Sequence, residues 1–330
     1  MYKPYLFLLF VLIIFSCTKN DKRIPKAEKA KVDLKVERLE KQLFTFKGKS
    51  DVEEFLQKHP SFVTEFLGLP YPVKDPRFIQ IFYDLYSNPA LHQFYEEAQK
   101  EFGDFSDIKT QMEGMFAYIK YFYPKYKIPK VETAITGFKF NKDMAVSDNA
   151  IIISYDYFLG PKASQRPNLF DYFLVRYRKP YLTSMIALAI SSKFNNANLN
   201  DQTMVASMIY YGKAHYFVER VLPDLADSLN IMYSGQELKE VENHKNLIWG
   251  HFISEKLLFN STRFIVDKYC GERPKVVEIG DKCPGRIGRW LGWQIVRSYM
   301  REHPEVTLKQ LMEEKDAQKI FKQSKFNPGR

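Results

Sequence analysis

The sequence lacks a second long apolar run after its first sixteen residues. A helix that crosses a bilayer needs about 20 predominantly apolar residues, and no later stretch of the chain offers them. We therefore do not expect the mature chain to cross a membrane. Internal repeats are also absent, and no low-complexity tract occurs beyond the basic segment that follows Cys17. The rest of the chain is expected to form a folded body.

Cysteine is scarce as well, with only Cys17, Cys270 and Cys283 in 330 residues. An exported chain meets an oxidising compartment, where two thiols can form a disulfide. A bridge between Cys270 and Cys283 would add about 3 kcal/mol of stability in the chain-entropy description. We predict this disulfide, and the alternative is two free thiols.

The first seventeen residues have the pattern of an export signal. Lys3 precedes the apolar run from Tyr5 to Phe15, which is too short to span a membrane and suits a cleaved signal peptide, residues 1–16. The following Ile14-Phe15-Ser16-Cys17 resembles a bacterial lipobox. It predicts a lipoprotein acylated on Cys17, with palmitate among its lipids, and held at a membrane by them. The alternative is an ordinary secretory signal with an incidental cysteine.

Residues 17–50 are predicted to form a basic tether. Lys and Arg outnumber Asp and Glu there by eleven to five, which accounts for more than half of the net charge of +10. Such a segment is solvated and extended, with order expected from about Val32 on. It would be attracted to an anionic bilayer, and the alternative is a spacer with no partner. Nucleic acid is not expected as a partner, because export separates the chain from it.

Residues 51–330 are predicted to form a single globular domain of the α+β class, mainly helical with a small sheet. The composition, 45% hydrophobic and 15% aromatic, allows a substantial core. A change of residue pattern at Lys130, with Asn141-Lys142-Asp143 joining the two segments, predicts strands at 131–140 and 150–157. Helical spacing after them predicts helices at 181–194, 202–221, 235–259 and 286–301.

The helix at 181–194 follows the two strands in the order used by zincin metalloproteases, which carry His-Glu-x-x-His on that helix. Here the helix contains no histidine and no acid, so no metal and no cofactor are expected. Relocated ligands are the alternative, with His244, His251 and Glu255 as candidates on one helical face. The isolated histidines His59, His92, His215 and His303 are expected to be structural or solvated.

The residue spacing of the last long predicted helix, 286–301, gives it two distinct faces. Glycines and aliphatic residues share one, and the spacing of Gly288 and Gly292 indicates close packing against a neighbour. The other face carries a possible interaction surface for a glycan, a lipid head group or a protein, consisting of Arg286, Arg289, Trp290, Trp293, Arg297 and Arg301. We favour the other interpretation, in which these arginines stack over partly buried tryptophans.

Several segments together resemble the GldB family of gliding motility lipoproteins of the Bacteroidetes phylum. They are Met208 to Phe217 (MIYYGKAHYF), Leu222-Pro223-Asp224, Pro284 to Gly288 (PGRIG) and Gly292 to Tyr299 (GWQIVRSY). The resemblance covers roughly Val32 to the C-terminus. That family is more distantly similar to predicted zinc-dependent proteases, which implies a zincin-like scaffold. On that pattern Leu188, Ala189, Ser192 and Tyr211 stand where the two histidines and two glutamates would be, which implies a pseudo-protease without its metal.

The sequence therefore predicts a non-enzymatic lipoprotein of the cell envelope, anchored at a membrane and facing the periplasm. The resemblance implies a structural or interaction role in gliding motility and the associated secretion machinery, with other envelope proteins of that machinery as partners. The alternatives are an envelope metallopeptidase or other hydrolase with relocated ligands, and a glycan-binding module.

Overall fold

The computed structural model describes residues 31–329 of the chain. The predicted signal peptide and Cys17 lie outside these residues. The described helices, in chain order, are α1 (Glu40–Leu43), α2 (Lys49–Lys58), the π-helical turn η2 (Phe62–Phe66), α3 (Pro76–Tyr86), α4 (Pro89–Phe102), α5 (Ser106–Phe122), the short η3 (Tyr155–Phe158), α6 (Asp171–Leu174), η4 (Lys179–Tyr181), α7 (Leu182–Ser191), α8 (Met204–Val221), α9 (Asp227–Ile231), α10 (Gly235–Asn243), α11 (Lys245–Ser254), α12 (Arg263–Cys270), α13 (Ile287–Glu302), α14 (Leu308–Glu313) and α15 (Ala317–Ser324).

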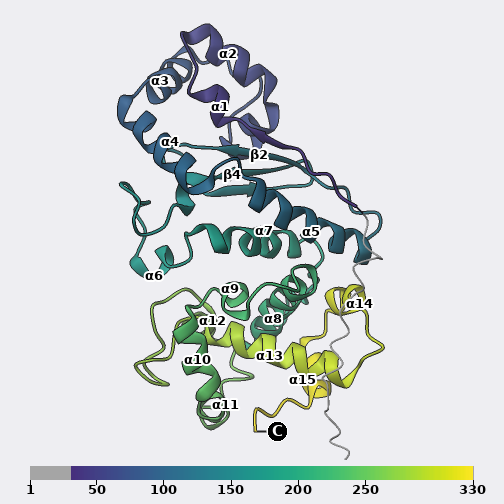
Figure 1. Ribbon diagram of the computed structural model, residues 1–330. Coiled ribbons are helices and arrows are strands. Elements are labelled where there is room, and N and C mark those ends of the chain that lie inside the picture. The colour runs from purple at the N-terminus through teal and green to yellow at the C-terminus, as the bar shows by residue number, and fades with distance from the viewer. Residues whose placement is uncertain (1–30, 330) are drawn as a thin grey trace, which may run out of the picture.

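The sheet contains the strands β1 (Val36–Arg38), β2 (Lys130–Ala134), β3 (Met144–Val146) and β4 (Ala150–Ser154), in the order β1-β2-β4-β3. The pairs β1–β2 and β2–β4 are parallel, whereas β3 runs antiparallel to β4. Figure 1 shows α2 and α3 on one side of this sheet and α5 and α7 on the other. The predicted α+β class, mainly helical with one small sheet, is confirmed.

Both predicted strands are shorter than their apolar patterns. β2 ends at Ala134, and Gly137 and Phe138 then take positive φ angles that turn the chain. β4 is buried on both sides, as its run of isoleucines predicts, but it ends at Ser154. The carboxylate of Asp156 just beyond it accepts hydrogen bonds from Ser154 Oγ and from the Thr136 backbone N–H. These local bonds join the two strand ends and replace a longer ladder.

The folded body begins well before Asp51, so the predicted domain boundary at residue 50 is wrong, whereas the expected onset of order near Val32 agrees with a first strand at Val36–Arg38. β1 pairs with β2 inside the sheet, and the side chains of Leu39 and Leu43 beside it are fully buried. The three-residue strand and the short helix were not predicted because the segment is highly charged. Only a few apolar positions are needed to fix an edge strand to an existing sheet.

The half of the molecule farther from the sheet is built around α8 and α13, with α10 and α11 at its far end (Figure 1). The prediction of one helix over 235–259 is wrong, because His244 leaves the helical conformation and separates α10 from α11. Ser234 and Glu237 form a capping box at the start of α10, as expected for that spacing. Apolar side chains of both halves belong to one connected core.

α8 and α13 cross at glycines, as the mid-helix glycines of α13 predict. A Cβ atom on Gly292 would lie 1.8 Å from the Met208 carbonyl oxygen, and one on Gly212 would lie 2.3 Å from the Gly292 carbonyl oxygen. The two backbones are therefore nearly in contact. No helix among the described residues has the length and apolar character needed to cross a membrane.

Candidate functional site

The four positions that the resemblance to zinc proteases singled out lie on α7, directly after it, and on α8, and these two helices pack together. The Ser192 hydroxyl donates a hydrogen bond to the Ala189 carbonyl, and the Arg289 guanidinium lies 4.2 Å from the centre of the Tyr211 ring. Leu188, Ala189, Ser192 and Tyr211 supply no imidazole and no carboxylate.

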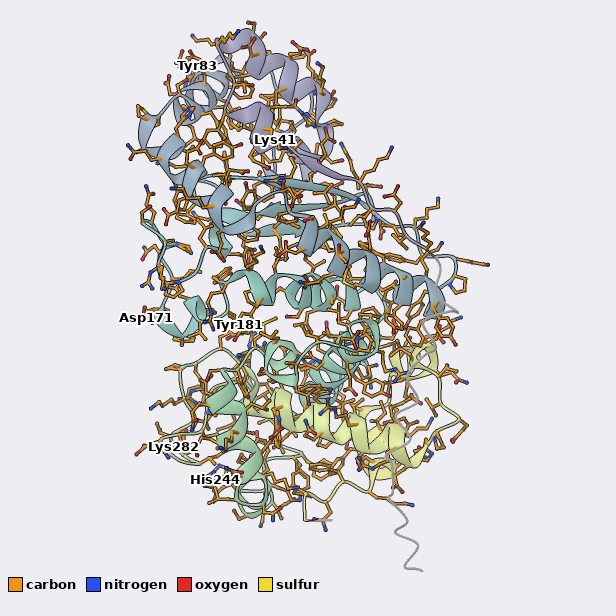
Figure 2. All side chains as sticks on the ribbon, viewed as in Figure 1. Lys41, Tyr83, Asp171, Tyr181, His244 and Lys282 are labelled. Carbon is orange, nitrogen blue, oxygen red and sulfur yellow. The ribbon has the colours of Figure 1, made fainter. Side chains whose placement is uncertain are left out.

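The relocated ligands His244 and His251 do not converge. His244 lies at the junction of α10 and α11 near Lys282, with its Nδ1 2.8 Å from the Glu240 carbonyl oxygen (Figure 2). His251 Nε2 instead lies 2.8 Å from the Tyr269 hydroxyl. The two imidazoles have separate partners, which argues against a shared metal.

The Arg and Trp face of α13 is largely internal, which agrees with the packing interpretation and not with an interaction surface. Trp293 is fully buried and Trp290 is 3% exposed. Arg297 lies over the Trp293 ring at 3.8 Å and donates hydrogen bonds to Glu219 and Asp227. Stacking of arginine over buried tryptophan is the arrangement that the packing interpretation predicts.

The other arginines of this face also have internal partners, with the exception of Arg301 near the C-terminal end of α13. Arg286 donates to the carbonyls of Ile231 and Met232, and Arg289 donates to that of Cys270. Arg301 is exposed and donates to the Ser298 hydroxyl. A glycan platform needs aromatic faces open to solvent, and neither tryptophan offers one.

The predicted disulfide is absent from the structure, where Cys270 and Cys283 are buried free thiols. Cys270 Sγ lies 3.7 Å from the Met204 sulfur, and Cys283 Sγ lies 3.8 Å from the Pro284 carbonyl oxygen. Burial raises the pKa of both thiols to about 12. Both are therefore protonated and unreactive at neutral pH.

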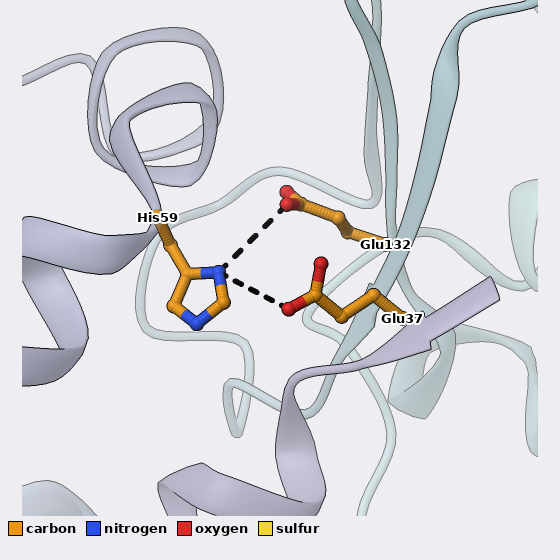
Figure 3. Close-up of side chains that lie close together, drawn as sticks. All are labelled: Glu37, His59 and Glu132. Atoms are coloured by element: carbon orange, nitrogen blue, oxygen red, sulfur yellow. Dashed lines mark ion pairs between the residues drawn. The ribbon is translucent and has the colours of Figure 1, made fainter. Parts of the chain in front are cut away.

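Three other side chains do converge, between the sheet and α2. Glu37 on β1, His59 at the end of α2 and Glu132 on β2 place one oxygen or nitrogen each within 4.8 Å of one another (Figure 3). His59 Nδ1 lies 3.6 Å from Glu37 Oε1 and 3.9 Å from Glu132 Oε1. Within residues 31–329 this is the one such group of potential metal ligands.

The cluster is buried at its centre and open at one edge. Glu132 is fully buried and His59 is 4% exposed, whereas the Glu37 side chain is 35% exposed. Lys130 Nζ lies 2.5 Å from Glu37 and 2.7 Å from Glu132. Burial raises the pKa of Glu132, but the adjacent His59 ring and Lys130 ammonium lower it by more, so its pKa lies below the usual value.

Sequence reasoning missed this cluster. Glu37 falls in the segment predicted to be a tether, and His59 looks like an isolated helix stop. The one available signal was Glu132, a charged residue within a predicted strand, because a charge that becomes buried in a sheet requires a partner.

Comparison with known proteins gives one match. The family model described as gliding motility protein GldB matches residues 20–328. No curated protein and no solved structure matches the chain.

Proposed function

Because the chain belongs to the gliding motility protein GldB family, we propose that it is a membrane-anchored, non-catalytic component of the gliding machinery in the cell envelope. The observation that carries the proposal is the extent of the family match, residues 20–328, which includes nearly all of the described body. The match thus concerns the whole fold and not one motif.

The side chains at the protease-like positions support a non-catalytic role. Zinc hydrolases need histidine or carboxylate ligands and a glutamate near the metal-bound water. Leu188, Ala189, Ser192 and Tyr211 provide neither. The body then acts through its surface, by contact with other envelope proteins of the motility and secretion machinery, and its scaffold is that of a pseudo-protease.

Membrane attachment in this proposal depends on Cys17 and its lipids. Several acyl chains hold a protein at a bilayer, whereas one chain binds only marginally. The acylated N-terminus would place the body on the periplasmic face, and the basic residues after Cys17 would add attraction to anionic lipid.

The test combines fractionation with motility. Cells that lack the chain should not glide, and wild-type protein should restore gliding and be found in the membrane fraction, extractable only with detergent. The Cys17→Ser variant should be soluble without detergent and should fail to restore gliding, with Ser16→Ala as the matched control that stays attached. Normal gliding in cells without the chain would contradict the role in motility, and membrane retention of Cys17→Ser would contradict the anchor.

A further inference from the structure

Two carboxylates lie side by side at the edge of the sheet. Glu37 and Glu132 are direct partners in the parallel pairing of β1 with β2. Like charges placed opposite one another on neighbouring strands are destabilising. Among residues 31–329, Lys130 is the one cation that contacts both of them, so two negative charges share one lysine ammonium.

The imidazole of His59 completes this arrangement. His59 is 4% exposed, and neither of its ring nitrogens has a hydrogen-bond partner among the described residues. Buried polar groups in proteins nearly always have a partner. The ring packs against Phe55 at a centroid distance of 4.5 Å, which fixes Nδ1 toward the two carboxylates (Figure 3).

We propose that Glu37, His59 and Glu132 bind a divalent cation of the Zn²⁺ class. One imidazole nitrogen and two carboxylate oxygens form a donor set that Zn²⁺ accepts. Bonds of about 2.0 to 2.2 Å place the ligand atoms of a tetrahedral site about 3.4 Å apart. The observed separations are 3.6 Å and 3.9 Å from His59 Nδ1, and all three ligand atoms lie within 4.8 Å of one another. Side-chain rotations would have to bring them closer together as the ion binds.

Lys130 and the cation would compete for the same two carboxylates. The lysine ammonium neutralises the carboxylates that the cation would bind, and the lysine side chain is 47% exposed. The Lys130 side chain can therefore turn toward solvent when the ion enters beside the partly exposed Glu37 carboxylate. The bound ion would connect β1 and β2 to the end of α2, and so fix the first strand of the body.

The experiment measures Zn²⁺ binding by the full-length protein in detergent, after removal of metal with a chelator. Titration calorimetry should show one Zn²⁺ per chain, and the midpoint of thermal unfolding should rise with Zn²⁺ but not with Mg²⁺. Glu37→Gln should weaken binding by about 100-fold or more, whereas the exposed control Glu53→Gln should bind as wild type. His59→Phe, which keeps the ring against Phe55, should bind no ion at this site.

Substitution of Lys130 distinguishes metal binding from a purely structural role, because a lysine that only stabilises the fold would not compete with a metal. Lys130→Met should bind Zn²⁺ more tightly than wild type by about tenfold, since no ammonium must be displaced. Since Glu37 is at the surface, Glu37→Gln should remain folded even if His59→Phe does not. Wild-type protein that takes up no Zn²⁺, or Glu37→Gln or Lys130→Met with unchanged affinity, would overturn the proposal.

Discussion

At the scale of single residues, Glu272 controls the charge balance between α13 and the loop after α6. The Arg176 guanidinium donates two hydrogen bonds to its carboxylate, at 3.0 Å and 2.6 Å. Arg289 and Arg286 approach the same carboxylate at 3.2 Å and 3.5 Å. Arg176 and Arg286 are both more than nine-tenths buried, so one carboxylate offsets three guanidinium groups that have little access to water.

Replacing Glu272 with glutamine should therefore lower the free energy of unfolding by about 3 kcal/mol at neutral pH, because it leaves buried positive charges without a counter-ion. Urea unfolding followed by circular dichroism would measure the loss. Glu242→Gln, at an exposed position of α10, is the matched control and should change stability little. Equal midpoints for the two variants would show that the carboxylate is not needed.

The same substitution predicts a pH dependence. Burial raises the pKa of Glu272, but the Arg176 hydrogen bonds and the charges of Arg286 and Arg289 lower it by more, to below 4.5. A depressed folded-state pKa stabilises the protein fully above pH 4.5 and progressively less as the pH falls through the folded value. The stability difference between wild type and Glu272→Gln should shrink as the pH falls below about 4.5 and through the lowered pKa of the folded state. A difference that stays constant over this range would contradict the ion-pair explanation.

The pairing of charged residues was the part of the structure least predictable from the sequence. Arg286 and Arg289 were recognised as a group from their spacing on one helix, but their partner Glu272 lies on a different segment, and no local pattern connects them. The same is true of Glu37 and Glu132, which only the register of two strands brings together. A sequence shows which charges need partners, whereas tertiary packing decides which partners they have.

At the scale of elements, the crossing of α8 and α13 depends on glycine at two positions. Helix axes lie 8 to 10 Å apart in ordinary packing, and smaller residues allow closer approach. The absent side chains of Gly212 and Gly292 allow the two backbones to touch. Each glycine weakens its own helix by about 1 kcal/mol relative to alanine, so the close contact must offset that cost.

Gly292→Ala should consequently destabilise the protein by about 2 to 4 kcal/mol, because the new Cβ would lie 1.8 Å from the Met208 carbonyl and force the helices apart. The midpoint of thermal unfolding would report the change. The control is Gly114→Ala in the middle of α5, where a Cβ meets nothing within 4 Å, and which should be slightly stabilising. A stabilised Gly292→Ala variant would mean that the crossing tolerates a methyl group.

Element prediction succeeded where periodicity is long and failed at element ends. The 18-residue α8 and the 16-residue α13 begin and end within two residues of their predicted bounds. The break at His244 was missed because apolar residues continue at helical spacing on both sides of it. The strand ends were missed because positive φ angles at Phe138 and the hydrogen bonds of Asp156 stop β2 and β4 within apolar sequence.

At the scale of the whole molecule, the structure changes where the tether ends and the body begins. Leu34, Leu39 and Leu43 contribute buried side chains to the connected core, and β1 covers the otherwise open edge of β2. The described part of the tether is therefore short, and the first strand of the body lies close in sequence to Cys17.

Truncation tests this boundary. A chain that begins at Lys31 retains β1 and should unfold cooperatively with the stability of the longer protein. A chain that begins at Asp51 loses three buried leucines and exposes an edge of β2, so its free energy of unfolding should fall by about 4 kcal/mol or more. Circular dichroism during urea unfolding would compare the two chains, and gel filtration would detect aggregation through the exposed strand. Equal stability of both chains would show that residues 31–50 serve only as a linker.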